Sequence, residues 1–161
     1  MFKKVALLAV AGLAISAQGA SATDLPSNLI VTATISGTCL FTTPNTVAFP
    51  TNITTTGTQI DIASVNMNVN CTAGIPYTIG MDFGQNQSGG VRRMTDGTNF
   101  LRYDIFRDNA RTQSYSAIGG GSVFSGTGAG AVTVPVFPSI LVQTTPPAAA
   151  YTDTIIATLR Y

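Results

Sequence analysis

Strict alternation of apolar and polar side chains is the feature that most constrains this chain. The segment VNMNVNC, residues 65–71, places two valines, a methionine and a cysteine at odd positions and three asparagines at even positions. Successive side chains of a strand point to opposite faces, so this pattern predicts a strand with one buried and one solvated face. The same period recurs in residues 75–83, 99–108, 131–137 and 151–161. We therefore expect a chain built from short strands.

Residues typical of turns separate these segments. Shorter apolar stretches at residues 46–50 and 59–63 add two candidate strands, and no segment has the apolar period of an amphipathic helix. Seven or eight short strands without a helix predict an all-β, antiparallel sandwich in a single domain. The glycine-rich stretch at residues 119–130 is expected to be one long loop.

The segment SNLIVTATISGTC, residues 27–39, also alternates, although it lies near the start of the chain. Its odd-numbered row, extended backwards by one further residue of the same parity, comprises Leu25, Leu29, Val31, Ala33 and Ile35. This row predicts a strand with an apolar face to bury. Two arrangements satisfy the pattern. The segment is either the first strand of the chain's own sandwich or a strand that completes the sheet of a neighbouring molecule.

The first residues predict export. Lys3 and Lys4 precede an apolar run at residues 5–15 and then small residues that end at Ala22. This is the pattern of a secretory signal peptide that is removed after residue 22. The apolar run is shorter than a membrane-spanning helix requires, and no later stretch is long enough, so no membrane insertion is expected.

Few charges remain after residue 22. Six arginines are balanced by seven aspartates, and there is no glutamate and no histidine. This balance offers no basic surface for nucleic acid. It also lacks the groups that most often transfer protons or attack substrates near neutral pH, so an enzyme is not expected. No cofactor is predicted.

The chain has two cysteines, Cys39 and Cys71. In an exported protein their simplest interpretation is one disulfide, and two free thiols are the alternative. A bond that closes a loop of this length stabilises a fold by roughly 3 to 4 kcal/mol in the chain-entropy model. A metal site is a poorer alternative, because no histidine or third cysteine could complete it.

Three stretches of the second half carry a family resemblance. They are LRYDIFRDNARTQSY from Leu101, VPVFPSI from Val134, and YTDTIIATLRY at the C-terminus. Together with TISGTC, which ends at Cys39, and VNMNVNC, which ends at Cys71, they resemble the spore coat protein U domain family. That family includes the pilin subunits of archaic, Csu-type chaperone–usher pili. The resemblance extends over the whole mature chain, and the run IFRDNART is its most specific part.

The resemblance implies an incomplete immunoglobulin-like antiparallel β-sandwich, completed by a donor strand from a neighbouring chain. In such pili a periplasmic chaperone lends a strand, the subunit passes to an outer-membrane usher, and the N-terminal segment of the next subunit replaces the chaperone. The domains expected on this basis are a signal peptide at 1–22, a donor-strand segment at 23–36 and a pilin domain at 37–161. The expected function is a structural subunit of a surface pilus that supports adhesion and biofilm formation.

The resemblance and the alternation together assign two surfaces. The donor strand is expected to present the apolar row of residues 25–35. The acceptor groove and the chaperone contact are expected at Ile155, Ala157, Leu159 and Tyr161. Contacts between different surfaces of identical or related subunits build an open head-to-tail fibre. The alternatives are a non-polymerising secreted coat or surface protein with the same sandwich, and a sugar-binding or tip adhesin, whose two-domain form would need about twice this length.

Overall fold

The computed structural model describes residues 27–42 and 46–161. The chain divides into two units, Met1–Thr34 and Ile35–Tyr161. In the first unit, the described residues 27–34 belong to no helix or strand and are all exposed. The second unit contains all the strands that the described residues form.

The leading segment is the first difference from the sequence-based expectation. The predicted signal peptide at 1–22 and Leu25 lie outside the described residues. The alternative in which residues 27–39 form the first strand of the chain's own sandwich is wrong for residues 27–38, and β1 (Cys39–Phe41) begins only at the cysteine. The donor-strand alternative stays a prediction. A strand exists only where a neighbour supplies the other half of the hydrogen-bond ladder. No described strand pairs with residues 27–38.

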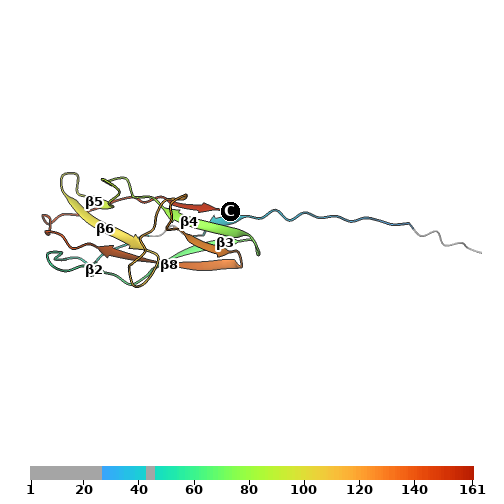
Figure 1. Cartoon of the computed structure of the whole chain (residues 1–161), viewed down its shortest axis with the longest axis horizontal. Helices are drawn as coiled ribbons and strands as arrows, with labels where there is room; N and C mark the ends of the chain where they lie inside the picture. The colour runs from blue at the N-terminus through green and yellow to red at the C-terminus, as the bar shows by residue number, and fades with distance from the viewer. Residues whose placement is uncertain (1–26, 43–45) are drawn as a thin grey trace, which may run out of the picture. The chain divides into compact units, whose positions relative to one another are not determined.

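Two antiparallel sheets form the second unit, as Figure 1 shows. Their strands are β1 (Cys39–Phe41), β2 (Ile60–Asp61), β3 (Val65–Cys71), β4 (Pro76–Met81), β5 (Arg93–Thr95), β6 (Phe100–Phe106), β7 (Phe124–Thr127), β8 (Gly130–Ile140) and β9 (Ala157–Arg160). The larger sheet has the order β1-β3-β8-β6-β5, with β2 beside β8, and the smaller has the order β7-β4-β9. Within the described ranges, no helix is long and apolar enough to cross a membrane. The predicted all-β antiparallel class is confirmed.

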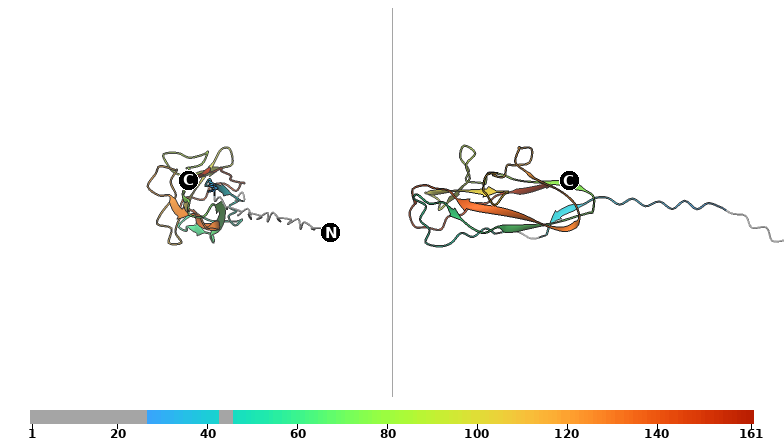
Figure 2. Two further views of the ribbon diagram at one scale, coloured as in Figure 1. Left: turned by 90° about the vertical axis from the view of Figure 1, so that its right-hand side faces the viewer. Right: turned by 60° about the horizontal axis from the view of Figure 1, so that its bottom comes forward.

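Strand β8 joins the two halves of the larger sheet and is its longest strand, drawn in orange in Figure 2. Its first part, up to Val136, pairs with β3, and its last part pairs with β6 on one side and β2 on the other. Pro135 lies in the first part, where the edge of β8 opposite β3 has no described strand partner. The missing N–H of this proline therefore costs no ladder hydrogen bond.

The core lies between the two sheets, and alternation decides which side chains enter it. In β3, Met67, Val69 and Cys71 are buried, whereas Asn66 and Asn70 are exposed. Tyr115, outside the strands, belongs to the same cluster. Strands β4, β6 and β8 contribute further large members: Tyr77, Ile79, Met81, Leu101, Tyr103, Ile105, Val134, Val136 and Ile140. Burying an aliphatic side chain of this size stabilises the fold by about 1.5 to 3 kcal/mol.

Three shorter segments differ from their predictions. Residues 119–130, expected to be a loop, contain β7, which pairs with β4. Glycine misled the prediction, because Gly126 lies within this strand and a Cβ there would lie only 2.6 Å from the Tyr77 hydroxyl. Residues 46–50, expected to be a strand, belong to no strand, and only β2 forms within 59–63.

The run IFRDNART, which begins in β6, makes a tight turn with a structural role. The carboxylate of Asp108 accepts hydrogen bonds from the backbone N–H groups of Thr112 (3.1 Å) and Gln113 (2.9 Å). Arg111 then donates from Nη2 to the Ile62 carbonyl (2.8 Å) and forms an ion pair with Asp61. The turn therefore ties the end of β6 to the junction of β2 and β3.

Candidate functional site

An open groove lies between the two sheets of the second unit. One cavity of about 700 Å³ lies between the residues that follow β1 and those that precede β9. A second cavity of about 570 Å³ extends it. The two cavities adjoin, because they share the lining residues Val47, Phe49, Met94 and Tyr151. Together they are called the groove.

The floor of this groove is the hydrophobic core itself. Met67, Tyr103, Ile105 and Val136 line the larger cavity from the β3-β8-β6 side, and Met81 lines it from β4. In a closed sandwich, side chains of a covering strand would fill this space. The described residues therefore leave part of this core without a covering strand.

One wall of the groove begins at residues 152–157 and continues into β9, and one of its backbone edges has no described strand partner. Its even-numbered residues form hydrogen bonds with the segment that follows β4. The Asp82 N–H donates to the Ile156 carbonyl and the Gln85 N–H to the Thr154 carbonyl, both at 3.1 Å. Successive residues of an antiparallel strand direct their backbone groups to opposite edges. The odd-numbered residues therefore direct N–H and C=O toward the open edge, where the described strands offer β9 no second partner.

The predicted acceptor residues lie at or just beyond this wall. Ile155 and Ala157 line the groove. Leu159 is half-buried against the core, opposite Ile79 of β4. Tyr161 follows the end of β9 and is 60 % exposed. The structure thus brings the first three together on one face and leaves Tyr161 outside the core.

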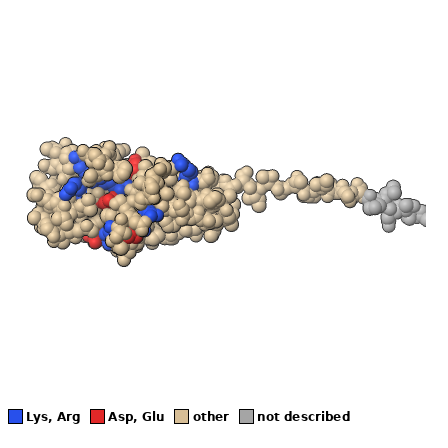
Figure 3. All heavy atoms as spheres, in the orientation of Figure 1, with Lys and Arg blue, Asp and Glu red and all other residues tan. Residues whose placement is uncertain are grey.

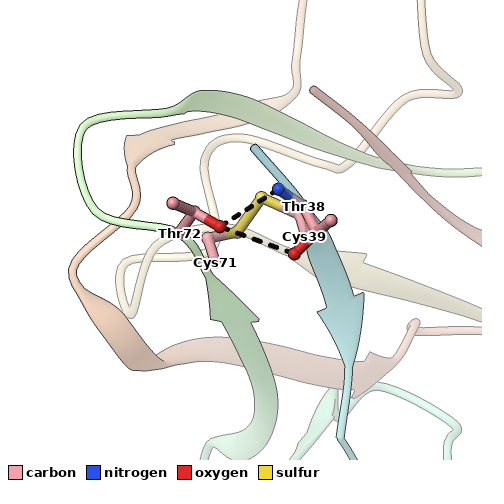
Figure 4. The surroundings of a disulfide bond; sticks show 4 residues. All are labelled: Thr38, Cys39, Cys71 and Thr72. Carbon is pink, nitrogen blue, oxygen red and sulfur yellow. Dashed lines mark hydrogen bonds between the residues drawn. A yellow bond between two sulfur atoms is a disulfide. The ribbon is translucent and has the colours of Figure 1, made fainter. Parts of the chain in front are cut away.

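The opposite wall follows β1 and includes Phe41 and Thr42. A disulfide fixes its start, because Cys39 and Cys71 lie directly opposite each other with Cα atoms 4.1 Å apart. Figure 4 shows the bond beside Thr38, whose N–H donates to the Thr72 hydroxyl at 3.1 Å. The predicted disulfide is confirmed, and it holds this wall of the groove against β3.

A carboxylate interrupts the apolar lining. Asp153 lines the larger cavity, and its Oδ2 accepts a hydrogen bond of 2.6 Å from the Tyr103 hydroxyl. Its Oδ1 accepts from the N–H and the side-chain amide of Asn86, at 3.2 and 2.9 Å. Burial, and then the Asp153 carboxylate, raise the pKa of Tyr103 well above its ordinary value. Tyr103 therefore remains a hydrogen-bond donor at any ordinary pH.

A second carboxylate holds the same wall where β9 begins. The Oδ1 atom of Asp82 accepts from the backbone N–H groups of Ile156 (2.9 Å) and Gly84 (3.0 Å). Gly84 has a φ of 80°, and a Cβ there would overlap the Asp153 carboxylate. A glycine is therefore required both by the backbone conformation and by the space that Asp153 occupies.

A third polar contact joins the sheets beneath the groove wall. Arg92 is 2 % exposed, and its Nη1 lies 2.6 Å from Oδ1 of Asp104 in β6. Its guanidinium also donates to the carbonyls of Met81 (3.1 Å), Asp82 (2.7 Å) and Tyr115 (2.8 Å). These bonds satisfy a buried charge and link β4 to β6.

Figure 3 shows that charged side chains are sparse on the face in view.

Sequence reasoning missed the Tyr103–Asp153 pair, although parity contains a signal for it. Asp153 has the parity of Ile155, Ala157 and Leu159, so an inward carboxylate stands in an otherwise apolar row. A charged group on an inward face requires buried hydrogen-bond partners. Among the described residues, no three histidine, cysteine, aspartate or glutamate side chains are grouped to hold a metal.

Comparisons with known proteins agree with this architecture. The family model described as Spore Coat Protein U domain matches residues 25–158. No curated protein matches the chain. Among solved structures, the chain is similar to one in the CsuC-CsuE chaperone-tip adhesion subunit pre-assembly complex from the archaic chaperone-usher Csu pili of Acinetobacter baumannii. The TM-score is 0.59 and the identity 23 %, over 80 % of this chain and 40 % of that one, so the likeness concerns the fold.

Proposed function

The chain belongs to the Spore Coat Protein U domain family, and from this premise we propose that it is a structural subunit of a surface pilus assembled by the chaperone–usher pathway. The observation that supports this proposal best is the open groove over the core, which ends in an unpaired strand edge. Such an edge binds an extended segment through its backbone and selects that segment's side chains through the groove.

Residues 23–36 supply the strand that fills the groove of a neighbouring subunit. Leu29, Val31 and Ile35 are 88 %, 83 % and 86 % exposed, so this chain leaves a row of aliphatic side chains in water. Each would stabilise the complex by about 1.5 to 3 kcal/mol on burial, before the cost of ordering the segment. Each new ladder hydrogen bond adds about 0.5 to 1.5 kcal/mol.

The donor strand runs antiparallel to β9. Strand β1 begins at the same end of the second unit at which β9 finishes. Cys39, the first residue of β1, pairs with Cys71 at the end of β3. A short turn leads from Cys71 to β4, and the first part of β4 pairs with Arg160 at the end of β9. A donor strand antiparallel to β9 therefore enters the groove at the end where β9 finishes and leaves it at the end where β9 begins. The pilin domain of the donating subunit follows its residue 36 and so lies beyond that second end. Successive subunits therefore stack head to tail, and an open fibre results unless the rotation closes.

Before assembly, a periplasmic chaperone covers the groove with a strand of its own, and an outer-membrane usher then receives the subunit. An exposed strand edge above an open core would otherwise pair with other chains and aggregate. Residues 1–22 direct export, residues 37–161 form the pilin domain, and Tyr161 contacts the chaperone. The subunit is structural rather than catalytic, and its fibre supports adhesion and biofilm formation at the cell surface.

The test deletes residues 23–36 from the full chain and expresses both forms with the chaperone and usher. We expect fibres by electron microscopy from the full chain and none from the deleted form. The deleted form should still keep its Cys39–Cys71 bond, and its folded domain should bind a synthetic peptide of residues 23–36. Fibres as abundant as those of the full chain would overturn the proposal. A stable monomer that needs no chaperone would instead favour a non-polymerising coat protein.

A further inference from the structure

Asp153 is the one charged residue that lines the larger cavity in the described part of the chain. Its carboxylate cannot turn away, because Tyr103 holds one oxygen and Asn86 holds the other. Tyr103 is itself 5 % exposed and lies in the groove floor. The groove therefore has a fixed polar position between apolar stretches.

We propose that the Tyr103–Asp153 pair sets the register of the incoming donor strand. Among the inward donor side chains, only the smallest, that of Ala33, fits opposite Asp153. The inference rests on the proposed function and adds the residues that determine how the donor is aligned. A bulky aliphatic side chain over the carboxylate would remove water from it without supplying a hydrogen bond, which is costly. A methyl group leaves the carboxylate its present partners.

The alternation of both strands makes this alignment definite. Inward side chains of the wall are odd-numbered, and so are those of the donor, so directly opposite pairs join odd residues. With Ala33 opposite Asp153, the antiparallel direction places Val31 opposite Ile155 and Leu29 opposite Ala157. The longest central donor side chain then lies opposite the smallest residue of the wall. The same alignment satisfies both size requirements.

Neighbouring alignments fail at Asp153. A shift by two residues places either Ile35 or Val31 against the carboxylate. A shift by one residue turns the threonines of the donor inward. Serine could donate to the carboxylate, but bringing Ser27 opposite Asp153 requires a shift of six residues. That shift places Thr23 opposite Ala157, leaves Leu25 opposite Ile155, and moves Val31 and Ile35 past the start of the wall.

Disulfide cross-linking between cysteines introduced into the full chain measures the alignment of the donor strand directly. Opposite residues in a hydrogen-bonded antiparallel pair have Cα atoms about 5.5 Å apart, within the range that a disulfide spans. We expect the variant with Val31→Cys and Ile155→Cys to form disulfides between subunits of assembled fibres. The pairs Val31→Cys with Ala157→Cys, and Leu29→Cys with Ile155→Cys, report the two alignments shifted by two residues. None of these variants changes Ala33, Asp153 or Tyr103.

Substitution of the donor tests the size requirement. Ala33→Leu should lower the rate of fibre formation by about tenfold or more, because leucine then meets the carboxylate. Its matched control is Thr34→Leu, an outward position of the same segment, which should polymerise at close to the original rate. Equal rates for these two variants, or cross-links only in a shifted pair, would overturn the inference while leaving the proposed function intact. A full chain that forms no fibres would overturn both.

Discussion

Residues 27–35 and strand β3 show the same alternation in sequence and opposite environments in the structure. Val69 of β3 is fully buried, whereas Val31 of the leading segment is 83 % exposed. Strand β3 has β1 on one side and β8 on the other, and no described strand pairs with the leading segment. The comparison teaches that alternation specifies a face to be buried, without specifying which molecule buries it.

The groove is the second region in which apolar side chains lack a covering strand among the described residues. One backbone edge of residues 152–160 forms hydrogen bonds with β4 and the segment that follows it. The other edge faces the groove, and Ile155 and Ala157 line the cavity above the core. Under the proposed function, association between subunits would bury both the apolar row of one chain and the incomplete core of the next.

The largest effect is expected for a charge in the buried segment. Val69→Asp would place a carboxylate in the core without a partner and destabilise the domain by on the order of 4 kcal/mol or more, enough to prevent folding. Protease resistance of the subunit purified together with its chaperone provides the measurement. Asn70→Asp, on the solvated face of the same strand, is the control and should fold. A folded Val69→Asp domain would contradict the assignment of the core.

The corresponding change in the exposed segment should leave the fold unchanged and abolish assembly. Val31→Asp adds no buried charge to the single subunit, so its thermal unfolding should match that of the original chain. In the fibre the same carboxylate would be buried, and polymerisation should be lost. Sedimentation of fibres provides the measurement, with Thr32→Asp, whose side chain faces outward, as the control. Equal polymerisation by the two variants would argue against burial of the odd-numbered row.

The disulfide should have an intermediate effect. Replacing Cys39 and Cys71 together by alanine removes a covalent link across β1 and β3 and should lower the free energy of unfolding by about 3 to 4 kcal/mol. Because β1 begins one wall of the groove, binding of a peptide of residues 23–36 should also weaken. Urea denaturation and peptide titration provide the measurements. An unchanged affinity would show that β1 keeps its position without the bond.

The smallest effect is a dependence on alkaline pH. Burial raises the pKa of Tyr103 far above its ordinary value, and raises that of Tyr115 to about 12. Below about pH 10, both tyrosines are protonated in the folded and unfolded states, so their contribution to stability is constant. Above it the unfolded chain loses these protons first, so stability falls as the pH rises. The melting temperature should therefore decrease above about pH 10, and less steeply in Tyr103→Phe.

Particular residues show how far sequence reasoning extends. The faces of β3, the disulfide and the inward parity of Ile155 and Ala157 were predictable, because they depend on local alternation and on the presence of only two cysteines. Strand β7 was not, because glycines that indicate a loop instead allow a close approach to Tyr77. The donor and acceptor roles of these rows stay predictions that the experiments above test.

Side-chain order along a few consecutive residues is enough to predict short two-faced strands and an apolar face on the leading segment. The presence of only two cysteines favours a disulfide, and the structure confirms it. Tertiary packing alone leaves the described residues with a space above the core and places Tyr103 against the inward Asp153, 50 positions away. Both depend on which distant segments pack together, and side-chain periodicity contains no information about that choice.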